Sequence, residues 1–75
     1  MITEKFVIES YAGFTDEKYL ELHDTKEDLW QSLEEMAVRE DWIDDKKEIF
    51  DDLKNEGEHV QGYDYIKIYK SYVQV

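Results

Sequence analysis

The fold of this chain is decided by residues 24–57, which read DTKEDLWQSLEEMAVREDWIDDKKEIFDDLKNEG. Apolar side chains recur in this stretch at the three- and four-residue spacing of a helix. The pattern predicts two consecutive helical segments, with strands and turns before and after them. Gly57 suits the left-handed residue that commonly ends a helix, so we expect the second segment to stop there.

The first helical segment starts at a recognisable N-cap, either Asp24 or Thr25, with Glu27 or Asp28 three residues further on. This arrangement approximates a capping box, and the acidic residues also complement the helix dipole. One apolar stripe then runs along the segment. It consists of Leu29, Leu33, Met36 and Ala37, with Trp30 on its flank.

The second helical segment covers about residues 44–55. No proline forces a break before it, so a kink near residues 41–45 and one continuous helix both stay open. We expect Trp30 and Trp42 to pack in the core, the alternative being that they anchor an interface. The inner face of this segment carries Trp42, Ile49, Phe50 and Leu53.

The negative charge of the chain is concentrated in these helical segments. The whole chain has a formal net charge of −11, and residues 27–58 contribute −9 through thirteen acidic and four basic side chains. On a continuous helix, four acids would form one stripe on the outer side, at spacing i, i+4, i+7 and i+11. They are Asp41, Asp45, Glu48 and Asp52, with Asp44, Asp51 and Glu56 beside them.

The flanking sequence predicts strands. Residues 5–11 and 19–23 suggest a hairpin, residues 58–62 a polar connector, and residues 63–75 a last strand. We therefore expect one α+β domain over residues 1–75, with the order β-β-α-α-β. Its three-stranded, antiparallel-type sheet would have both helical segments on one face. The inward side chains would be Phe6, Ile8, Leu20, Leu22, Ile66 and Ile68, with Tyr65 and Tyr69 exposed on the other face.

The sequence shows no pattern of a catalytic, cofactor or metal site. His23 and His59 lack the spacing of a zinc site, and we expect them to be exposed polar residues. The serines have no glycine elbow, the glycines are scattered, and there is no cysteine. No apolar run is long enough to span a bilayer. We therefore expect a non-enzymatic, cytoplasmic protein without cofactor, metal ion or membrane contact.

The charge pattern indicates a binding function. An acidic surface repels nucleic acid and attracts basic protein surfaces, so a basic groove built for nucleic acid is the expected partner. The chain resembles the small acidic proteins of phages and mobile elements that block host nucleases, including anti-restriction and anti-CRISPR DNA mimics. The resemblance is one of composition and implies an inhibitor acting in the cytoplasm of a bacterial host. It is carried by Glu34, Glu35, Asp41, Asp44, Asp45, Glu48, Asp51 and Asp52.

A second hypothesis places the interaction on the sheet. Tyr65 and Tyr69 belong to a tyrosine-rich strand whose exposed row could bind a protein or a second copy of the chain. The acidic helices would then serve solubility alone. Charge reversal on the helices and alanine substitution of the two tyrosines distinguish the hypotheses.

Overall fold

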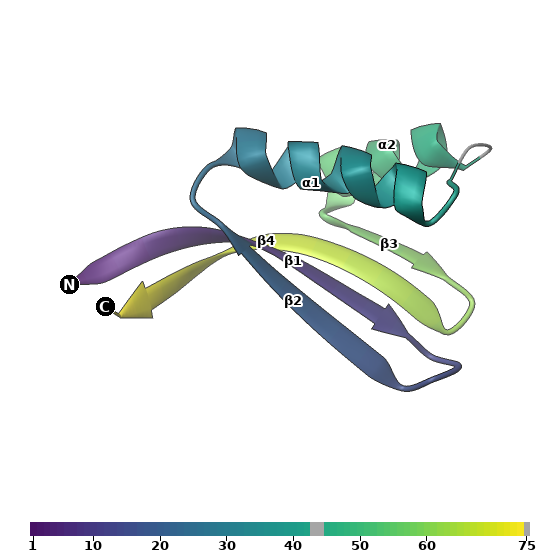
Figure 1. Cartoon of the computed structure of the whole chain (residues 1–75), viewed down its shortest axis with the longest axis horizontal. Helices are drawn as coiled ribbons and strands as arrows, with labels where there is room; N and C mark the ends of the chain where they lie inside the picture. The colour runs from purple at the N-terminus through teal and green to yellow at the C-terminus, as the bar shows by residue number, and fades with distance from the viewer. Residues whose placement is uncertain (43–44, 75) are drawn as a thin grey trace.

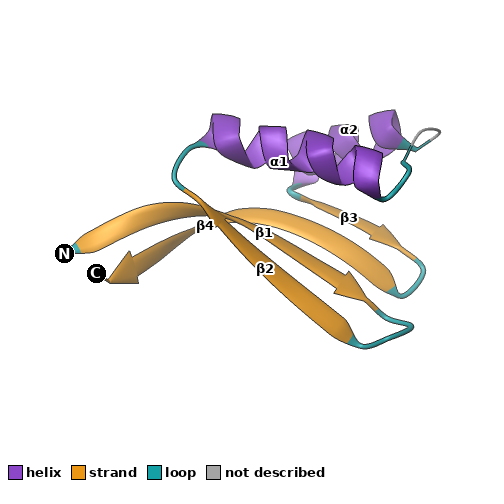
Figure 2. Ribbon diagram, in the orientation of Figure 1, coloured by secondary structure: helices purple, strands orange, loops and turns teal. Residues whose placement is uncertain are grey.

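The computed structural model describes residues 1–42 and 45–74 and shows an α+β fold with a four-stranded antiparallel sheet (Figure 1). The strands are β1 (Ile2–Ala12), β2 (Glu17–His23), β3 (Glu58–Gln61) and β4 (Asp64–Gln74), and the helices are α1 (Lys26–Arg39) and α2 (Lys46–Glu56). The strands lie in the order β2-β1-β4-β3. Both helices cover the same face of the sheet, as predicted (Figure 2).

The prediction of three strands is wrong, because residues 58–61 form β3 rather than a connector. In the hairpin that follows, Gln61 pairs with Asp64, so the turn has only two residues. The first of them, Gly62, has a φ of +61°, which suits a type II′ turn. The buried side chain of β3 is His59 rather than an aliphatic residue. The stretch therefore lacks the alternation of apolar and polar residues that marks a strand.

The two helices are separate, which excludes the continuous helix. Thr25 is the N-cap of α1, and its Oγ1 accepts a hydrogen bond from the Asp28 N–H at 3.1 Å. At the other end Asp41 has a φ of +59°, and its N–H donates to the carbonyl oxygen of Val38. The N–H of Trp42 donates to the carbonyl oxygen of Ala37 at 2.9 Å. This pair of bonds is a Schellman motif, which turns the chain away from the helix axis.

The core lies between the helices and the sheet. Leu33 is fully buried at the centre of α1, and Ile8 of β1 is the buried strand residue that packs with the helices. Trp30 and Trp42 are half-buried against this core, as expected. The predicted inward positions of Phe6, Ile8, Ile66 and Ile68 are confirmed. The helices contribute Leu29, Leu33, Met36, Ala37, Ile49, Phe50 and Leu53.

The predicted inward position of Leu20 and Leu22 in β2 is wrong, because the strand presents its opposite face to the helices. Leu20 and Leu22 are 60 % and 55 % exposed, because they lie opposite Glu9 and Val7 of β1. Directly opposed residues share a face, so both leucines lie on the face that the helices leave open. A shift of one residue moves every side chain of a strand to the other face. Val7 is nevertheless buried, between Leu22 of β2 and Tyr69 of β4.

The hairpin turns and the termini lie at opposite ends of the sheet (Figure 1). The Gly13 N–H donates to Asp64 Oδ1 at 2.8 Å, which joins the β1–β2 turn to the start of β4. A Cβ atom at Gly13 would lie 2.3 Å from Tyr63 Cβ, so only glycine fits this contact. Beyond the helices, the start of β1 and the end of β4 pair as a two-stranded ribbon, in which Ile2 lies opposite Gln74.

Candidate functional site

The first candidate surface is the acidic helical layer, which we define as residues 26–56 without the buried side chains. This stretch contains twelve of the twenty acidic side chains and five of the nine basic ones, a net charge of −7. Glu34 and Glu35 lie on α1, and Asp41 lies in the turn after it. Asp45 is the N-cap of α2, and Asp44 lies outside the described residues. The other three predicted residues, Glu48, Asp51 and Asp52, belong to α2.

Three of the predicted carboxylates have a cationic or imidazole partner. Glu34 pairs with Lys46 at 2.5 Å, which joins α1 to α2. Asp51 pairs with Lys47 at 2.9 Å, and this hydrogen bond lowers the pKa of Asp51 and raises the pKa of Lys47. The third, Asp52, accepts a hydrogen bond from His59 beneath α2. These three carboxylates therefore have less of their charge available to a partner.

The other described carboxylates of the predicted set are free of ion pairs. Glu35, Asp41, Asp45 and Glu48 are exposed, and within residues 1–42 and 45–74 none of them has a cation within salt-bridge distance. The break after α1 means that they do not form the predicted single stripe. They are distributed instead over the two helices and the turn between them. Trp30 of α1 and Phe50 of α2 are in contact, with 5.7 Å between their ring centroids.

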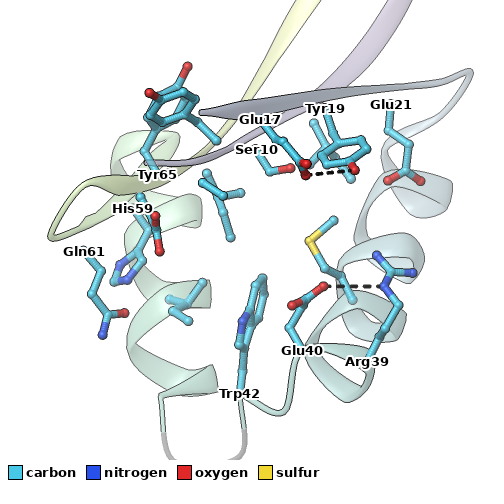
Figure 3. A pocket seen from close by; sticks show the side chains of 17 residues that line it. Ser10, Glu17, Tyr19, Glu21, Arg39, Glu40, Trp42, His59, Gln61 and Tyr65 are labelled. Carbon is cyan, nitrogen blue, oxygen red and sulfur yellow. Dashed lines mark hydrogen bonds and ion pairs between the residues drawn. The ribbon is translucent and has the colours of Figure 1, made fainter. Parts of the chain in front are cut away.

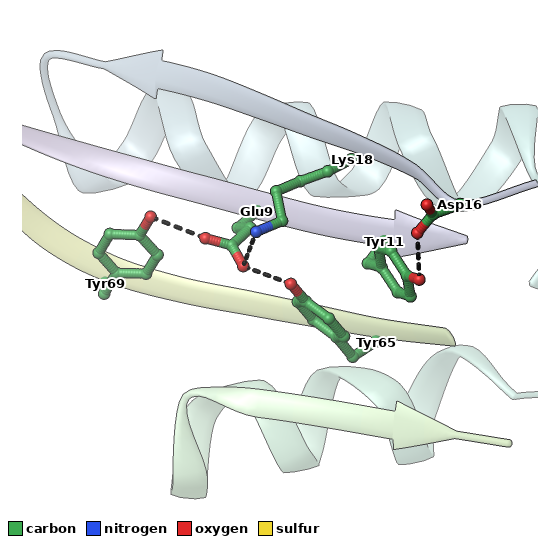
Figure 4. Close-up of polar contacts among 6 residues, drawn as sticks. All are labelled: Glu9, Tyr11, Asp16, Lys18, Tyr65 and Tyr69. Atoms are coloured by element: carbon green, nitrogen blue, oxygen red, sulfur yellow. Dashed lines mark hydrogen bonds and ion pairs between the residues drawn. The ribbon is translucent and has the colours of Figure 1, made fainter. Parts of the chain in front are cut away.

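The second candidate surface is the open sheet face, the side of the sheet without helices. Glu9 lies near its centre with only 15 % of its side chain exposed (Figure 4). Its carboxylate accepts hydrogen bonds from the hydroxyls of Tyr65 at 2.6 Å and Tyr69 at 3.0 Å, and Lys18 Nζ lies 3.9 Å away. The structure thus brings together both predicted tyrosines around an acid that the sequence did not single out.

These contacts shift the ionisation of the whole group. The hydrogen bond from Tyr65 is the largest cause that holds the pKa of Glu9 below its usual value. The same bond raises the pKa of Tyr65 to about 12, and burial followed by the bond to Glu9 raises the pKa of Tyr69. At neutral pH the arrangement is therefore one carboxylate held by two neutral phenols, a fixed polar centre on a sheet surface.

Aromatic and apolar groups surround this centre. Tyr11 stacks on Tyr65 with 5.2 Å between ring centroids, and its hydroxyl donates to Asp16 at 2.6 Å. Leu20 and Leu22 extend the surface over β2 as exposed apolar side chains. The open sheet face therefore has an apolar part beside an ordered polar part, a combination that is typical of protein-binding surfaces.

A third feature is a cavity of about 660 Å³ between the helical layer and the sheet (Figure 3). Its wall includes His59, which is 9 % exposed rather than solvent-exposed as predicted. His59 Nδ1 lies 2.7 Å from Asp52 Oδ2, but Nε2 is buried and has no hydrogen-bond partner among the described residues. A buried polar atom without a partner costs about 1–3 kcal/mol. The sequence signal for it was weak, a lone histidine in a polar stretch.

Within the described ranges, no three histidine or acidic side chains gather closely enough to hold a metal ion. Every helix in residues 1–42 and 45–74 falls short of the length and apolar character that a bilayer-spanning segment requires.

Comparison with protein-family models, with curated proteins and with solved structures finds no match to this chain.

Proposed function

We propose that this chain is a non-enzymatic binding protein whose acidic helical layer occupies a basic groove of a nucleic-acid-binding protein or nuclease. It would act as an inhibitor, in the manner of the anti-restriction and anti-CRISPR DNA mimics that its composition resembles. The observation that carries the proposal is the group of exposed carboxylates without a cation: Glu35, Asp41, Asp45 and Glu48.

The physical basis is electrostatic. The acidic helical layer has a net charge of −7, and a cationic groove would relieve the repulsion among its carboxylates on binding. Complementary charge mainly accelerates association and makes it sensitive to salt. Glu34 and Asp51 are already paired with Lys46 and Lys47, so these two carboxylates would have to give up their ion pairs before they could meet the cations of a basic groove. We therefore assign the leading role to the unpaired acids.

The test is capture from a bacterial lysate by the immobilised chain, at low and high salt, followed by elution with duplex DNA. The charge reversal Glu35→Lys with Glu48→Lys alters the acidic helical layer. The matched control, Glu17→Lys with Glu58→Lys, makes the same change in net charge at exposed positions on the sheet. We expect the wild type to capture nucleic-acid-binding proteins that both high salt and duplex DNA release. The first variant should lose this capture, and the second should retain it.

Two results would contradict the proposal. One is recovery of only neutral or acidic proteins whose capture is insensitive to salt. The other is equal loss of capture in both double variants, because general charge rather than the helical layer would then be responsible. Circular dichroism of each variant establishes that the fold is unchanged.

A second candidate function is a protein-interaction or self-association module that uses the open sheet face. The observation that favours it is the exposure of Leu20 and Leu22 beside the ordered centre of Glu9, Tyr65 and Tyr69. Replacing both leucines with serine should abolish partner capture or dimer formation under this alternative. The fold should tolerate the change, because more than half of each side chain already contacts water. Sedimentation of the wild type and this variant distinguishes a homodimer from a monomer.

A further inference from the structure

The outer edge of β2 is open (Figure 2). The strand order β2-β1-β4-β3 gives β2 a single neighbour, β1, and six of its seven residues are exposed. Among the described residues, no backbone hydrogen bond outside the helices and strands involves β2. The opposite edge strand, β3, has only four residues. A long open edge is a template for another strand, so β2 is the place where this sheet can be extended.

The hydrogen-bond pattern of the sheet determines which backbone groups of β2 point outward. The N–H of Ile68 in β4 donates to the carbonyl oxygen of Gly57, so Ile68 points toward the β3 side. Successive residues of an antiparallel strand direct their N–H and C=O alternately to one side and to the other. Tyr69 therefore points toward β1, where it is paired with Val7. It follows that Val7 points back toward β4 and that Ile8 points toward β2.

The same alternation continues into β2. Ile8 is paired with Glu21, so Glu21 directs its N–H and C=O toward β1. Its neighbours Leu20 and Leu22 direct theirs away from the sheet, and so does Lys18. The outer edge of β2 thus presents a donor and an acceptor at every second residue, the arrangement that another antiparallel strand requires.

The side chains of β2 are complementary to a second β2 in antiparallel orientation. The central pair would be Leu20 with Leu20 of the second copy, which exchange backbone hydrogen bonds. On the helix side of the sheet, Tyr19 would lie opposite Glu21 of the second copy. Glu17 would lie opposite His23. Both cross-pairs place a side chain that can donate a hydrogen bond beside a carboxylate.

The open side of the sheet supports the same register. Lys18 would lie opposite Leu22 of the second copy, and its aliphatic stem can cover that leucine. The neighbouring registers are disfavoured, because a twofold axis at Glu21 opposes this carboxylate to itself, and an axis at Tyr19 opposes Glu17 to Glu21. Like charges directly opposite each other destabilise a strand pair.

The helical layer leaves room for this pairing. α1 packs over both β1 and β2, and Ser32 Oγ donates to Glu21 Oε1 at 2.6 Å. Neighbouring strands lie about 4.8 Å apart, so helices that cover successive strand pairs lie about 10 Å apart. That separation is close to the about 8–10 Å between packed helices. The α1 helices of two copies can therefore lie side by side.

We propose that two copies of this chain pair along β2, antiparallel about Leu20, into one continuous sheet with all helices on the same face. The contact is isologous, so it closes as a dimer. It rests on the strand edge and is independent of both functions proposed above. Each copy has a net charge of −11, so salt strengthens the dimer by screening the repulsion, whereas it weakens capture of a basic partner.

Single cysteines test the register, because the chain contains no cysteine of its own. Leu20→Cys places two thiols on opposed residues with about 5.5 Å between their Cα atoms, within the range of a disulfide. Leu22→Cys is the matched control, since the two side chains are 60 % and 55 % exposed. In the proposed register the two copies of residue 22 are more than about 13 Å apart. We expect Leu20→Cys to form the disulfide dimer at least about tenfold faster under the same oxidant.

Proline substitutions test the edge. Leu20→Pro removes an outward N–H and leaves the pairing with β1 intact. The matched control is Val60→Pro on β3. Ile66 points toward β3 like Ile68 and pairs with His59, so the N–H of Val60 points outward, and this side chain is 61 % exposed. In sedimentation equilibrium up to about 1 mM and at high salt, we expect wild type and Val60→Pro to dimerise and Leu20→Pro to raise the dissociation constant at least about tenfold.

Amide hydrogen exchange gives a third measurement that needs no variant. The amides of Lys18, Leu20 and Leu22 should become protected as the wild-type concentration rises, whereas that of Glu21 is protected throughout. Should Leu20→Pro fail to fold, this exchange and the cysteine variants decide. The proposal is overturned by a wild type that stays monomeric at about 1 mM, by equal cross-linking of the two cysteine variants, by loss of the dimer in Val60→Pro, or by amides of Leu20 and Leu22 that stay unprotected.

Discussion

The substitution Glu9→Gln gives a direct measure of the ordered centre on the open sheet face. In the wild type, the hydroxyl of Tyr65 donates a hydrogen bond to the Glu9 carboxylate at 2.6 Å. Ionising Tyr65 would break this bond and place a phenolate beside the negative carboxylate. The pKa of Tyr65 is therefore raised from its ordinary value of 10.0 to about 12, chiefly by its hydrogen bond to Glu9. Glutamine removes the negative charge, and its amide N–H can donate to a phenolate. We therefore expect the pKa of Tyr65 to fall most of the way back toward its ordinary value in the variant.

The assay is a pH titration of the tyrosine Cζ resonances in both proteins. Tyr11 is the internal control, because its pKa is raised by the hydrogen bond to Asp16 rather than by Glu9. The pKa of Tyr11 should therefore stay raised in the variant. The reasoning is refuted if wild-type Tyr65 titrates near 10, or if its pKa remains near 12 after the substitution.

The same shift predicts how folding stability depends on alkaline pH. The pKa of Tyr65 is higher in the folded state than in the unfolded state, so the folded protein retains this proton more tightly. Its contribution to stability is complete below pH 10 and is lost as the pH rises toward about 12. Urea titrations across this range should show a steeper loss of stability for the wild type than for Glu9→Gln.

Three further substitutions test the fold. Leu33→Ala, at a fully buried position, should lower the free energy of unfolding by about 2–5 kcal/mol in urea denaturation. The control is Val38→Ala, at an 83 % exposed position, which should change the same free energy by less than about 0.5 kcal/mol. Gly13→Ala should lower the free energy of unfolding by about 1–3 kcal/mol, because the new methyl group forces the two hairpin turns apart and shifts the resonances of Tyr63. An unchanged midpoint of urea denaturation would contradict that contact. Thr25→Ala should lower the free energy of unfolding by about 0.5–2 kcal/mol, because the helix loses its N-cap hydrogen bond. As controls, Thr25→Ser should keep the stability of the wild type and Thr25→Val should not.

Local signals predicted the helices well. The N-cap of α1, the buried stripes of both helices and the left-handed Gly57 all follow from residues that are neighbours in the sequence. Helix hydrogen bonds and caps join residues at most a few positions apart, so the sequence contains what is needed to place them. The break after α1 was less visible, because it depends on Asp41 in a left-handed conformation rather than on glycine or proline.

The candidate surfaces were predicted in part. The acidic residues lie on the helical layer as expected, but their ion pairs depend on contacts such as Glu34 with Lys46, which join two helices. The role of Glu9 had no signal in the sequence, since Tyr65 lies 56 positions away and reaches it only through the pairing of β1 with β4. The burial of His59 likewise required β3 to be placed beneath α2.

The sequence by itself determined the fold class, the two helices and their acidic outer side, because helical periodicity, capping and charge are properties of short segments. The tertiary structure alone decided which face of β2 carries Leu20 and Leu22, that residues 58–61 become a strand, and which acids remain unpaired. Strand register is set by partners distant in the sequence, and a change of one residue exchanges the two faces. The surfaces on which both proposed functions depend are therefore products of strand pairing and helix packing.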